Sequence, residues 1–256
     1  AAILAVDALG PEHVYGVSLP STITSDASIE DARAVAENLG IEFDVVPVGG
    51  AVETLEATIE SATGEAVAGL AAENIQARAR GVVLMTLANA RDGLVLTPDN
   101  KSEAAVGYCT LYGDTVGALA PLGDCYKTLV YELAEYYNEQ PPVGSEPVIP
   151  ERVIDKPPTA ELREDQTDED ELPEYDALDP VLEAYIHGQA TGADLRREFP
   201  DHVVDEALAR IARSEFKRWQ TPPPLRITKK SFDRGWKYPI AASYDAVLEV
   251  GEDERD

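Results

Sequence analysis

Charged residues gather in one segment of the sequence, DNKSEAAVGYCTLYGD (residues 99–114). Lys101 lies close to the carboxylate of Glu103, Asp114 ends the segment, and glycines supply flexible backbone between them. No helical stripe or strand alternation runs through the segment from end to end, so packing alone does not explain its composition. Carboxylates suit a hard cation and lysines hold anionic groups, so this combination is typical of a site for charged ligands.

This segment follows an apolar run, GLVLT (93–97), which is one of three predicted strands; the others are HVYGVSLP (13–20) and IEFDVVPV (41–48). Helices are predicted around them at residues 2–9, 28–40 and 65–91. The alternation predicts an α/β fold, a parallel sheet with helices on both faces. Because ligands bind at the carboxyl ends of such strands, we expect residues 99–114 at the ligand-binding edge.

The second half of the sequence is more helical and contains long connections. Its predicted helices are at residues 126–138, 151–156, 176–187, 191–198 and 202–219. The acidic stretch 156–176 lacks periodicity, and such runs are more often solvated loops than sites. Residues 221–241 read as a mostly extended tail. We expect no internal repeat in this arrangement.

The composition excludes several classes of function. Forty-eight acidic and 21 basic residues give a formal net charge of −27, a surface that repels DNA, RNA and anionic lipid. No apolar run approaches the roughly 20 residues of a membrane-spanning helix, and no signal-peptide pattern is present. Cys109 and Cys125 are too few for a disulfide framework, which favours a reducing cytoplasm. His13, His187 and His202 show no metal-ligand spacing.

Only seven of the 21 basic residues are lysines. An acidic, lysine-poor surface suggests a salt-rich cytoplasm, although a merely acidic mesophilic protein would have the same composition. If the charge is a halophilic adaptation, the melting temperature should rise substantially between low salt and molar KCl, because salt screens the self-repulsion. Thermal unfolding in increasing KCl measures this, and a flat response would favour the merely acidic alternative.

Several stretches together resemble, in the family's order, the synthetase domain of NAD synthetases. They are ENIQARARG, NKSEAAVGYCTLYGD, PLGDCYKTLVYELA, KPPTAELREDQTDEDELPEYDALD, and EFKRWQTPPPLRIT with RGWKYPIA. The tail resembles the long, glutamine-dependent branch. The resemblance implies the fold of the adenine nucleotide α-hydrolase-like ATP pyrophosphatases. It implies one domain over residues 1–256, with an α/β nucleotide-binding core at 1–140 and a helical and extended C-terminal part at 141–256.

The resemblance also implies a reaction, the ATP-dependent amidation of deamido-NAD to NAD. In this family ATP adenylates the nicotinate carboxylate, and ammonia then displaces AMP. The ammonia is either free or released from glutamine by an attached amidase domain. By the same resemblance we expect a homodimer, because the family builds its deamido-NAD site across a subunit interface.

Two features depart from the family pattern. The Ser-Gly-Gly-x-Asp-Ser loop that cradles pyrophosphate does not occur, and AAILAVDALG resembles the helix after it, so we expect the first strand and this loop upstream of Ala1. We therefore expect the 256-residue chain alone not to make NAD. A degenerate non-catalytic homologue and another ATP pyrophosphatase amide or thio ligase are the alternatives. In addition, Pro98 and Asp99 replace the usual threonine and glycine.

The resemblance assigns ATP and Mg²⁺ to particular residues. Glu103 matches the magnesium-binding glutamate, and Thr159 matches a hydroxyl residue near the phosphates and the metal. Lys127 matches a lysine on the nucleotide phosphates, and Ser18 is expected on the ATP side. Four of the seven lysines fall inside the motifs, namely Lys101, Lys127, Lys156 and Lys217. An acidic protein that binds anionic substrates needs such a concentration of cations.

The residues expected to contact deamido-NAD are Arg78, Lys101, Asp114, Asp168, Glu169 and Lys217. The guanidinium of Arg78 can grip an oxyanion in a fixed fork. Asp168 and Glu169 match acidic positions on a loop that covers the site. Lys217 matches a lysine near the reacting groups and, with Lys127, is expected to be catalytic. Each residue has an alternative role as an exposed or capping side chain.

Overall fold

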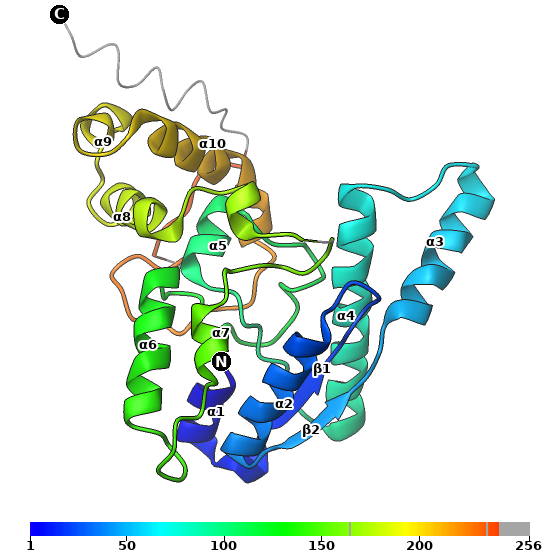
Figure 1. The fold of residues 1–256 in the computed structure, drawn as a ribbon. Helices are drawn as coiled ribbons and strands as arrows, with labels where there is room; N and C mark the ends of the chain where they lie inside the picture. The colour runs from blue at the N-terminus through cyan, green and yellow to red at the C-terminus, as the bar shows by residue number, and fades with distance from the viewer. Residues whose placement is uncertain (164, 234, 241–256) are drawn as a thin grey trace, which may run out of the picture.

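Two short parallel strands lie at the centre of the N-terminal half. In the computed structural model, β1 (Tyr15–Ser18) pairs with β2 (Glu42–Val45), starting with Tyr15 opposite Glu42 (Figure 1). Helix α2 (Asp26–Leu39) connects them and packs on both. The predicted α/β class with a parallel sheet is confirmed. The structure describes residues 1–163, 165–233 and 235–240.

The start of α2 differs from the prediction by two residues. The helix begins at Asp26 rather than at 28, because the Ser25 side chain accepts the N–H of Ser28 and caps the first turn. The end agrees with the prediction: Gly40 has a φ of 69°, a left-handed conformation that glycine adopts without strain.

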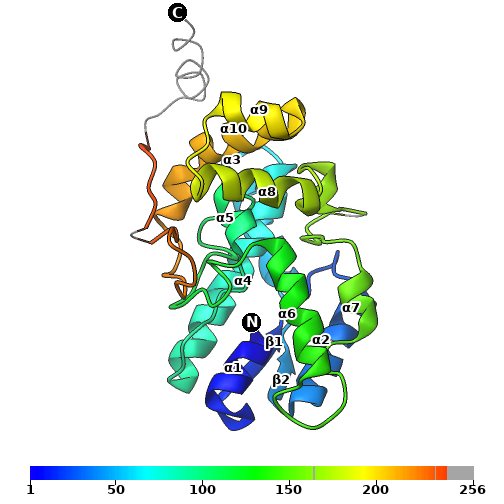
Figure 2. The same cartoon turned by 90° about the vertical axis from the view of Figure 1, so that its left-hand side faces the viewer.

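Helix α1 (Ala2–Leu9) precedes β1, with a 3₁₀ turn (Pro11–His13) between them. A small core joins α1 to α2 and to the connector before α7, through Ile3, Val6, Leu39 and Val148. Figure 2 shows α6 (Lys127–Glu139) and α7 (Glu151–Asp155) standing beside α1 and α2. The second half of the chain therefore covers the first.

The long helix predicted at 65–91 is α4 (Leu70–Arg91), and a separate helix, α3 (Gly49–Thr63), was not predicted. Gly64, with a φ of 75°, ends α3, and Gly69, with a φ of 57°, precedes α4. Helix α3 packs against α4 and projects from the body of the molecule (Figure 1). Only Val52 of α3 is buried, while Leu55 and Ile59, which follow it at helical spacing, are exposed.

The prediction of a third strand at residues 93–97 is wrong. Leu96 forms one isolated parallel bridge with Leu119, and Ala120 forms another with Pro224. The residues are extended and hydrogen-bonded, with the Thr97 N–H donating to the Leu119 carbonyl at 3.0 Å. Among the described residues they form no continuous ladder with another strand. The segment still delivers residues 99–114 to the start of a helix.

The C-terminal half is a helical layer with the largest apolar core of the described residues. Its elements are α5 (Lys101–Val106), α6, α7, a 3₁₀ turn (Asp168–Asp170), α8 (Tyr175–Ile186), α9 (Gly192–Glu198) and α10 (Asp201–Arg218). Leu178, Val204 and Leu208 are among its fully buried side chains. Helix α5, from the segment singled out above, packs against α8 and α10. The predicted helices of this half are present.

The tail after α10 runs without helix through the described residues up to 240. Arg234 and Ala241, which belong to the predicted extended tail, lie outside the described residues. In the part of the chain that the structure describes, no helix has both the length and the apolar character needed to cross a membrane.

Candidate active site

Glu103 is fixed by the first turn of α5. Asn100 caps this helix: its side chain accepts the Glu103 N–H at 3.0 Å, and the Glu103 carboxylate accepts the Asn100 N–H at 3.1 Å. This reciprocal capping box holds the glutamate in one orientation. The other carboxylate oxygen of Glu103 accepts a hydrogen bond from Lys127 Nζ at 3.0 Å.

Lys127 is the first residue of α6, and that helix start is anchored independently. The Lys127 N–H donates to Ser102 Oγ at 2.9 Å, and the buried Asp179 carboxylate accepts the Thr128 N–H at 2.9 Å. Ser102 also donates to Asp179, so α5 and α6 begin side by side. Glu103 and Lys127, 24 residues apart in sequence, are thus brought together by two helix termini.

The ion pair of Lys127 and Glu103 is only partly accessible, with each side chain 18% exposed. Burial acts to lower the pKa of Lys127, but the Glu103 carboxylate outweighs it and raises the pKa above the usual value. The Lys127 ammonium, which also lies 5.2 Å from the centre of the Tyr175 ring, therefore stays charged. A partly accessible fixed cation of this kind suits an anionic ligand.

Two further carboxylates repel Glu103. Burial raises the pKa of Asp99 to about 8, with further contributions from Asp114 and Glu103. Loss of water contact also raises the pKa of Asp114, and Glu103 adds to this effect. The N–H groups of Thr110 and Thr115 oppose the increase by donating to Asp114 at 2.6 and 3.0 Å. The negative electrostatic potential of these three carboxylates favours a bound cation.

The carboxylates of this segment fit Mg²⁺. Carboxylate oxygens are the hard ligands that this ion prefers, and it needs only one or two of them when phosphates and water complete the shell. The mutual repulsion of Asp99, Glu103 and Asp114 fits this requirement. Among the described residues, no group of three potential ligands is already arranged around one point. Substrate phosphates would therefore have to supply part of the shell.

Because the pKa of Asp99 is raised, removing its charge should increase the stability of the fold, and the increase should depend on pH. The folded-state pKa of Asp99 exceeds the ordinary value near 4. Protonated Asp99 therefore contributes its full stability to the fold below about pH 4, and this contribution is lost as the pH rises towards about 8. Asp99→Asn should raise the melting temperature at pH 8 by on the order of a few degrees and change it little at pH 4. Thermal unfolding in metal-free buffer measures this. Asp155→Asn, on exposed helix α7, is the control, and an equal gain at both pH values would contradict the assignment.

Arg78 and Asp114 flank the contact between helix α4 and the turn at Gly113. Arg78, on α4, is exposed and donates from Nε to the Leu111 carbonyl at 3.1 Å, next to the turn that carries Asp114. Gly113 permits this approach, because a Cβ there would lie 2.8 Å from the Cβ of Ala77 on α4. The structure thus brings Arg78 to the segment of residues 99–114.

Lys217 reaches the same segment from α10. Its Nζ donates to the carbonyl oxygens of Gly107 at 2.7 Å and Cys109 at 2.8 Å. Gly107 has a φ of 67° and ends α5, and a Cβ there would lie 2.3 Å from the Cβ of Ser214. Lys217 therefore holds the turn after α5, and its contacts in this structure are with backbone.

The other expected site residues occupy three places. Ser18 is the last residue of β1, at its carboxyl end. Thr159 lies in the loop after α7, where its Oγ1 accepts the Glu161 N–H at 3.1 Å. Asp168 is buried and Glu169 is exposed on the following 3₁₀ turn. No hydrogen bond among the described residues joins Ser18 or Thr159 to the pair of Glu103 and Lys127.

Lys101 is not at a binding surface in this structure, contrary to the expectation that it contacts deamido-NAD. Its side chain is 0% exposed and is ion-paired with Asp124, which is also 0% exposed. Its Nζ further contacts His187 Nε2 at 3.0 Å, Thr228 Oγ1 at 2.9 Å and the Lys230 carbonyl at 2.7 Å. These partners leave no ammonium hydrogen for a ligand, so the geometry gives Lys101 a structural role.

Tyr108 and Tyr175 were missed by sequence reasoning although both adjoin the site. Tyr175 lies under Lys127 and donates to Asp168 at 2.9 Å, and Tyr108 faces the same carboxylate. Tyrosines in helical surroundings read as core residues, and no spacing in the sequence marks them as neighbours of a lysine far away in the chain.

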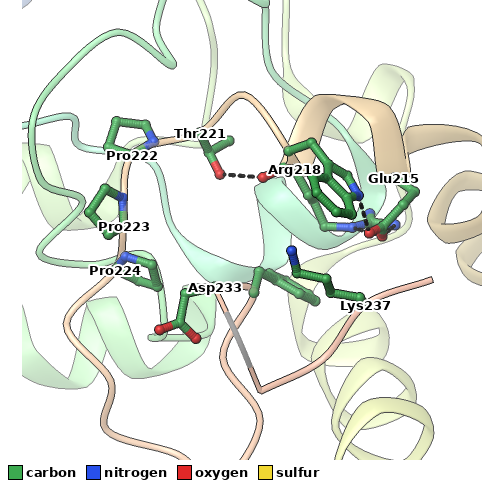
Figure 3. A pocket seen from close by; sticks show the side chains of 10 residues that line it. Glu215, Arg218, Thr221, Pro222, Pro223, Pro224, Asp233 and Lys237 are labelled. Carbon is green, nitrogen blue, oxygen red and sulfur yellow. Dashed lines mark hydrogen bonds and ion pairs between the residues drawn. The ribbon is translucent and has the colours of Figure 1, made fainter. Parts of the chain in front are cut away.

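A separate pocket of about 190 Å³ lies beside the end of α10 (Figure 3). Trp219, Phe232 and the run Pro222–Pro224 line it, and the Lys237 ammonium stands 3.6 Å from the centre of the Trp219 ring. None of the expected site residues lines this pocket. Its own lysine already covers its aromatic surface, so we do not place the chemistry there.

Comparison with known proteins identifies the family of this chain. The family model described as NAD synthase matches residues 1–221. The glutamine-dependent NAD(+) synthetase of Acinetobacter baylyi is 46% identical over 238 residues, which are 93% of this chain and 43% of that protein. The enzyme of the same name from Aquifex aeolicus is 44% identical over 244 residues, 95% of this chain and 42% of that protein. The chain thus spans less than half the length of these curated relatives.

Solved structures show the same relationship. A glutamine-dependent NAD+ synthetase from Acinetobacter baumannii in complex with ADP is 41% identical, with a TM-score of 0.58 over 95% of this chain and 43% of that chain. The NMN synthetase from Francisella tularensis is 27% identical, with a TM-score of 0.67 over 89% of this chain and 82% of that chain. The matched residues include the segment that carries Glu103 and Lys127. This chain belongs to the NAD synthase family.

Proposed function

We propose that the protein containing this chain is a ligase that amidates deamido-NAD to NAD at the expense of ATP. In the first step a carboxylate oxygen of the nicotinate attacks the α-phosphorus of ATP, and pyrophosphate leaves. In the second step ammonia attacks the carbonyl carbon, AMP leaves, and the nitrogen loses a proton. Ammonia comes free or from glutamine through an attached amidase domain, in line with the names of the relatives.

The observation that carries this proposal is the contact of Lys127 with Glu103 at the paired starts of α5 and α6. The Lys127 ammonium would stabilise negative charge on the departing pyrophosphate, because it is already oriented and already charged. Glu103, with the hydroxyl of Thr159, would hold Mg²⁺, and Ser18 would lie on the ATP side. When bound, Mg²⁺ would neutralise charge on the phosphates.

The deamido-NAD side would involve the opposite end of the same segment. Arg78, which already lies beside the turn of Asp114, would grip an oxyanion, and Asp114 would accept hydrogen bonds from the substrate. Glu169 would contribute from its loop, and Lys217 would stabilise charge as ammonia attacks. We withdraw Lys101 from this set because its ammonium is fully engaged in the interior.

The direct test is product analysis with the full-length protein. ATP, Mg²⁺, ammonium and deamido-NAD are expected to give equal amounts of NAD, AMP and pyrophosphate, with glutamine replacing ammonium if an amidase domain is attached. Nicotinic acid mononucleotide, offered in competition, should react more slowly. Preferred amidation of the mononucleotide would replace our substrate assignment. Absence of ATP-dependent amidation of both would favour a degenerate homologue or another ATP pyrophosphatase ligase.

Asp114→Asn should raise the KM for deamido-NAD by about tenfold and leave the Mg²⁺ requirement nearly unchanged. The change removes a charged acceptor on the substrate side while the amide oxygen can still accept from Thr110 and Thr115. Steady-state kinetics with deamido-NAD and Mg²⁺ varied in turn measure both quantities. A shifted Mg²⁺ dependence with an unchanged KM would move Asp114 to the metal side.

We also propose a homodimer in a reducing cytoplasm, with free Cys109 and Cys125. The exposed apolar side chains of α3 and α4, Leu55, Ile59, Val82 and Met85, offer a surface that a second copy would cover. Light scattering after gel filtration measures the mass. A monomer at micromolar concentration would contradict the proposed assembly without affecting the proposed chemistry.

A further inference from the structure

The Asp168 carboxylate and the hydroxyl groups of Tyr108 and Tyr175 form one buried polar cluster. Asp168 is only 4% exposed, and its Oδ2 accepts the Tyr175 hydroxyl at 2.9 Å. Its Oδ1 and the Tyr108 hydroxyl are both buried and, within the described residues, neither has a partner in hydrogen-bond geometry. A buried polar atom without a partner is costly, so these two atoms have a strong reason to meet.

The pKa shifts of Tyr108 and Asp168 have the directions expected of two groups that lie close together. Burial raises the pKa of Tyr108, and the charge of Asp168 raises it further. Burial also raises the pKa of Asp168, and the hydroxyls of Tyr175 and Tyr108 oppose this as donors. A small side-chain rotation would complete the second hydroxyl contact.

Asp168 also connects segments that carry site residues. Its N–H donates to the Pro158 carbonyl at 2.9 Å, directly before Thr159 in the chain. Its charge acts on Lys127, which lies over the ring of the same Tyr175. The Asp168 side chain is buried and cannot contact a ligand directly, but its neighbour Lys127 is partly exposed and can.

We propose that Tyr108 and Tyr175 form a hydroxyl clamp on Asp168, and that the clamped carboxylate positions the Lys127 ammonium and the Pro158–Thr159 segment. The clamp residues act through Lys127 and are positioning residues. This role replaces the expected contact of Asp168 with deamido-NAD. It rests on the proposed function, in which Lys127 contacts the phosphates of ATP.

The first test requires neither ATP binding nor catalysis. Lysine acetylation by acetic anhydride, followed by peptide mass spectrometry, gives the reaction rate of Lys127 relative to exposed Lys156. Tyr108→Phe and Tyr175→Phe should raise the relative rate of Lys127 severalfold, because the clamp would no longer fix the Tyr175 ring that lies against the ammonium. Tyr137→Phe is the control, since it removes a tyrosine–aspartate hydrogen bond of the same 2.9 Å length, to Asp7, at an exposed position away from Lys127. Unchanged Lys127 rates in both clamp variants would overturn the proposal.

The second test measures the coupling of the clamp to ATP in the full-length protein. Tyr108→Phe should weaken ATP binding by about tenfold, the effect of one hydrogen bond to a charged group, with the KM for deamido-NAD changed less than twofold. In an Asp168→Asn background the same change should have almost no further effect. Equal losses of affinity in the two backgrounds would show that Tyr108 acts independently of Asp168 and would overturn the clamp.

Two outcomes separate this inference from the proposed function. If the unchanged protein makes no NAD but the clamp variants expose Lys127 to acetylation, the proposed function fails and the clamp stands. If NAD is made and neither acetylation nor ATP affinity responds, the clamp fails and the function stands. Melting temperatures are recorded throughout, and because Tyr175 is 7% exposed, the Tyr108 variant decides the result if Tyr175→Phe does not fold.

Discussion

Glu103→Gln in the full-length enzyme is expected to lower kcat for NAD formation by on the order of a hundredfold. Glutamine keeps the length of the side chain and can still accept the Asn100 N–H, so the start of α5 should survive. It loses the charge that faces Lys127 at 3.0 Å and that would hold Mg²⁺ against the phosphates. Kinetics with Mg²⁺ varied from micromolar to tens of millimolar should show partial recovery at high Mg²⁺.

The matched control is Asp194→Asn, which makes the same carboxylate-to-amide change in a capping box on α9, away from the site. Its kcat should stay within about twofold of the unchanged enzyme, because the box contributes only to local helix stability. Equal kcat values for the two variants would show that the Glu103 charge is not used in the reaction. A loss of activity in Glu103→Gln that no Mg²⁺ concentration relieves would assign the charge to orienting Lys127 alone.

Local signals in the sequence predicted most helices and both strands of the parallel sheet, but they misplaced a third strand and missed a helix. Helix α10 has a regular apolar stripe that packs as Val204, Leu208 and Ile211, and periodicity was sufficient to find it. Helix α3 begins at two glycines, Gly49 and Gly50, which have low helix propensity, and its short apolar pattern was overlooked. The run GLVLT has strand propensity, but its pairing depends on residues near 119, which no local rule identifies.

The site was predictable only through resemblance between motifs. Spacing alone could not bring Glu103 to Lys127, because the contact depends on two helix starts that share Ser102 and Asp179. The resemblance supplied both residues, and the structure adds the distance and the charge state. The chain's acidic character suggested that cations would be concentrated at a site, but it could not say which lysines face a ligand.

Lys101 shows where that reasoning fails. Within its motif it looks like Lys127, yet its partners Asp124 and Thr228 are 23 and 127 residues away. Whether a lysine is solvated or ion-paired in the interior is decided by such distant contacts, so the local sequence is silent on it. Only the three-dimensional structure distinguishes a lysine that faces a ligand from one, like Lys101, that binds the C-terminal tail at Thr228 and Lys230.

Lys101→Met should lower the free energy of unfolding by about 3–5 kcal/mol, because it leaves the buried Asp124 charge without its cation. Asp124 would still accept the N–H groups of Ile227 and Thr228, at 2.9 and 2.7 Å, but these cannot neutralise it. Urea unfolding followed by circular dichroism measures the loss.

Lys156→Met is the control for this experiment, since its ion pair with Glu161 is at the surface and should contribute no more than about 1 kcal/mol. Limited proteolysis should also cut the tail near Thr228 faster in Lys101→Met, because the ammonium contacts both Thr228 and the Lys230 carbonyl. A loss no larger than that of the control, with an unchanged cleavage rate, would mean that packing rather than the ion pair retains the tail. Lys101 would then be free to take part in ligand binding after a rearrangement, and the structural role assigned to it here would be wrong.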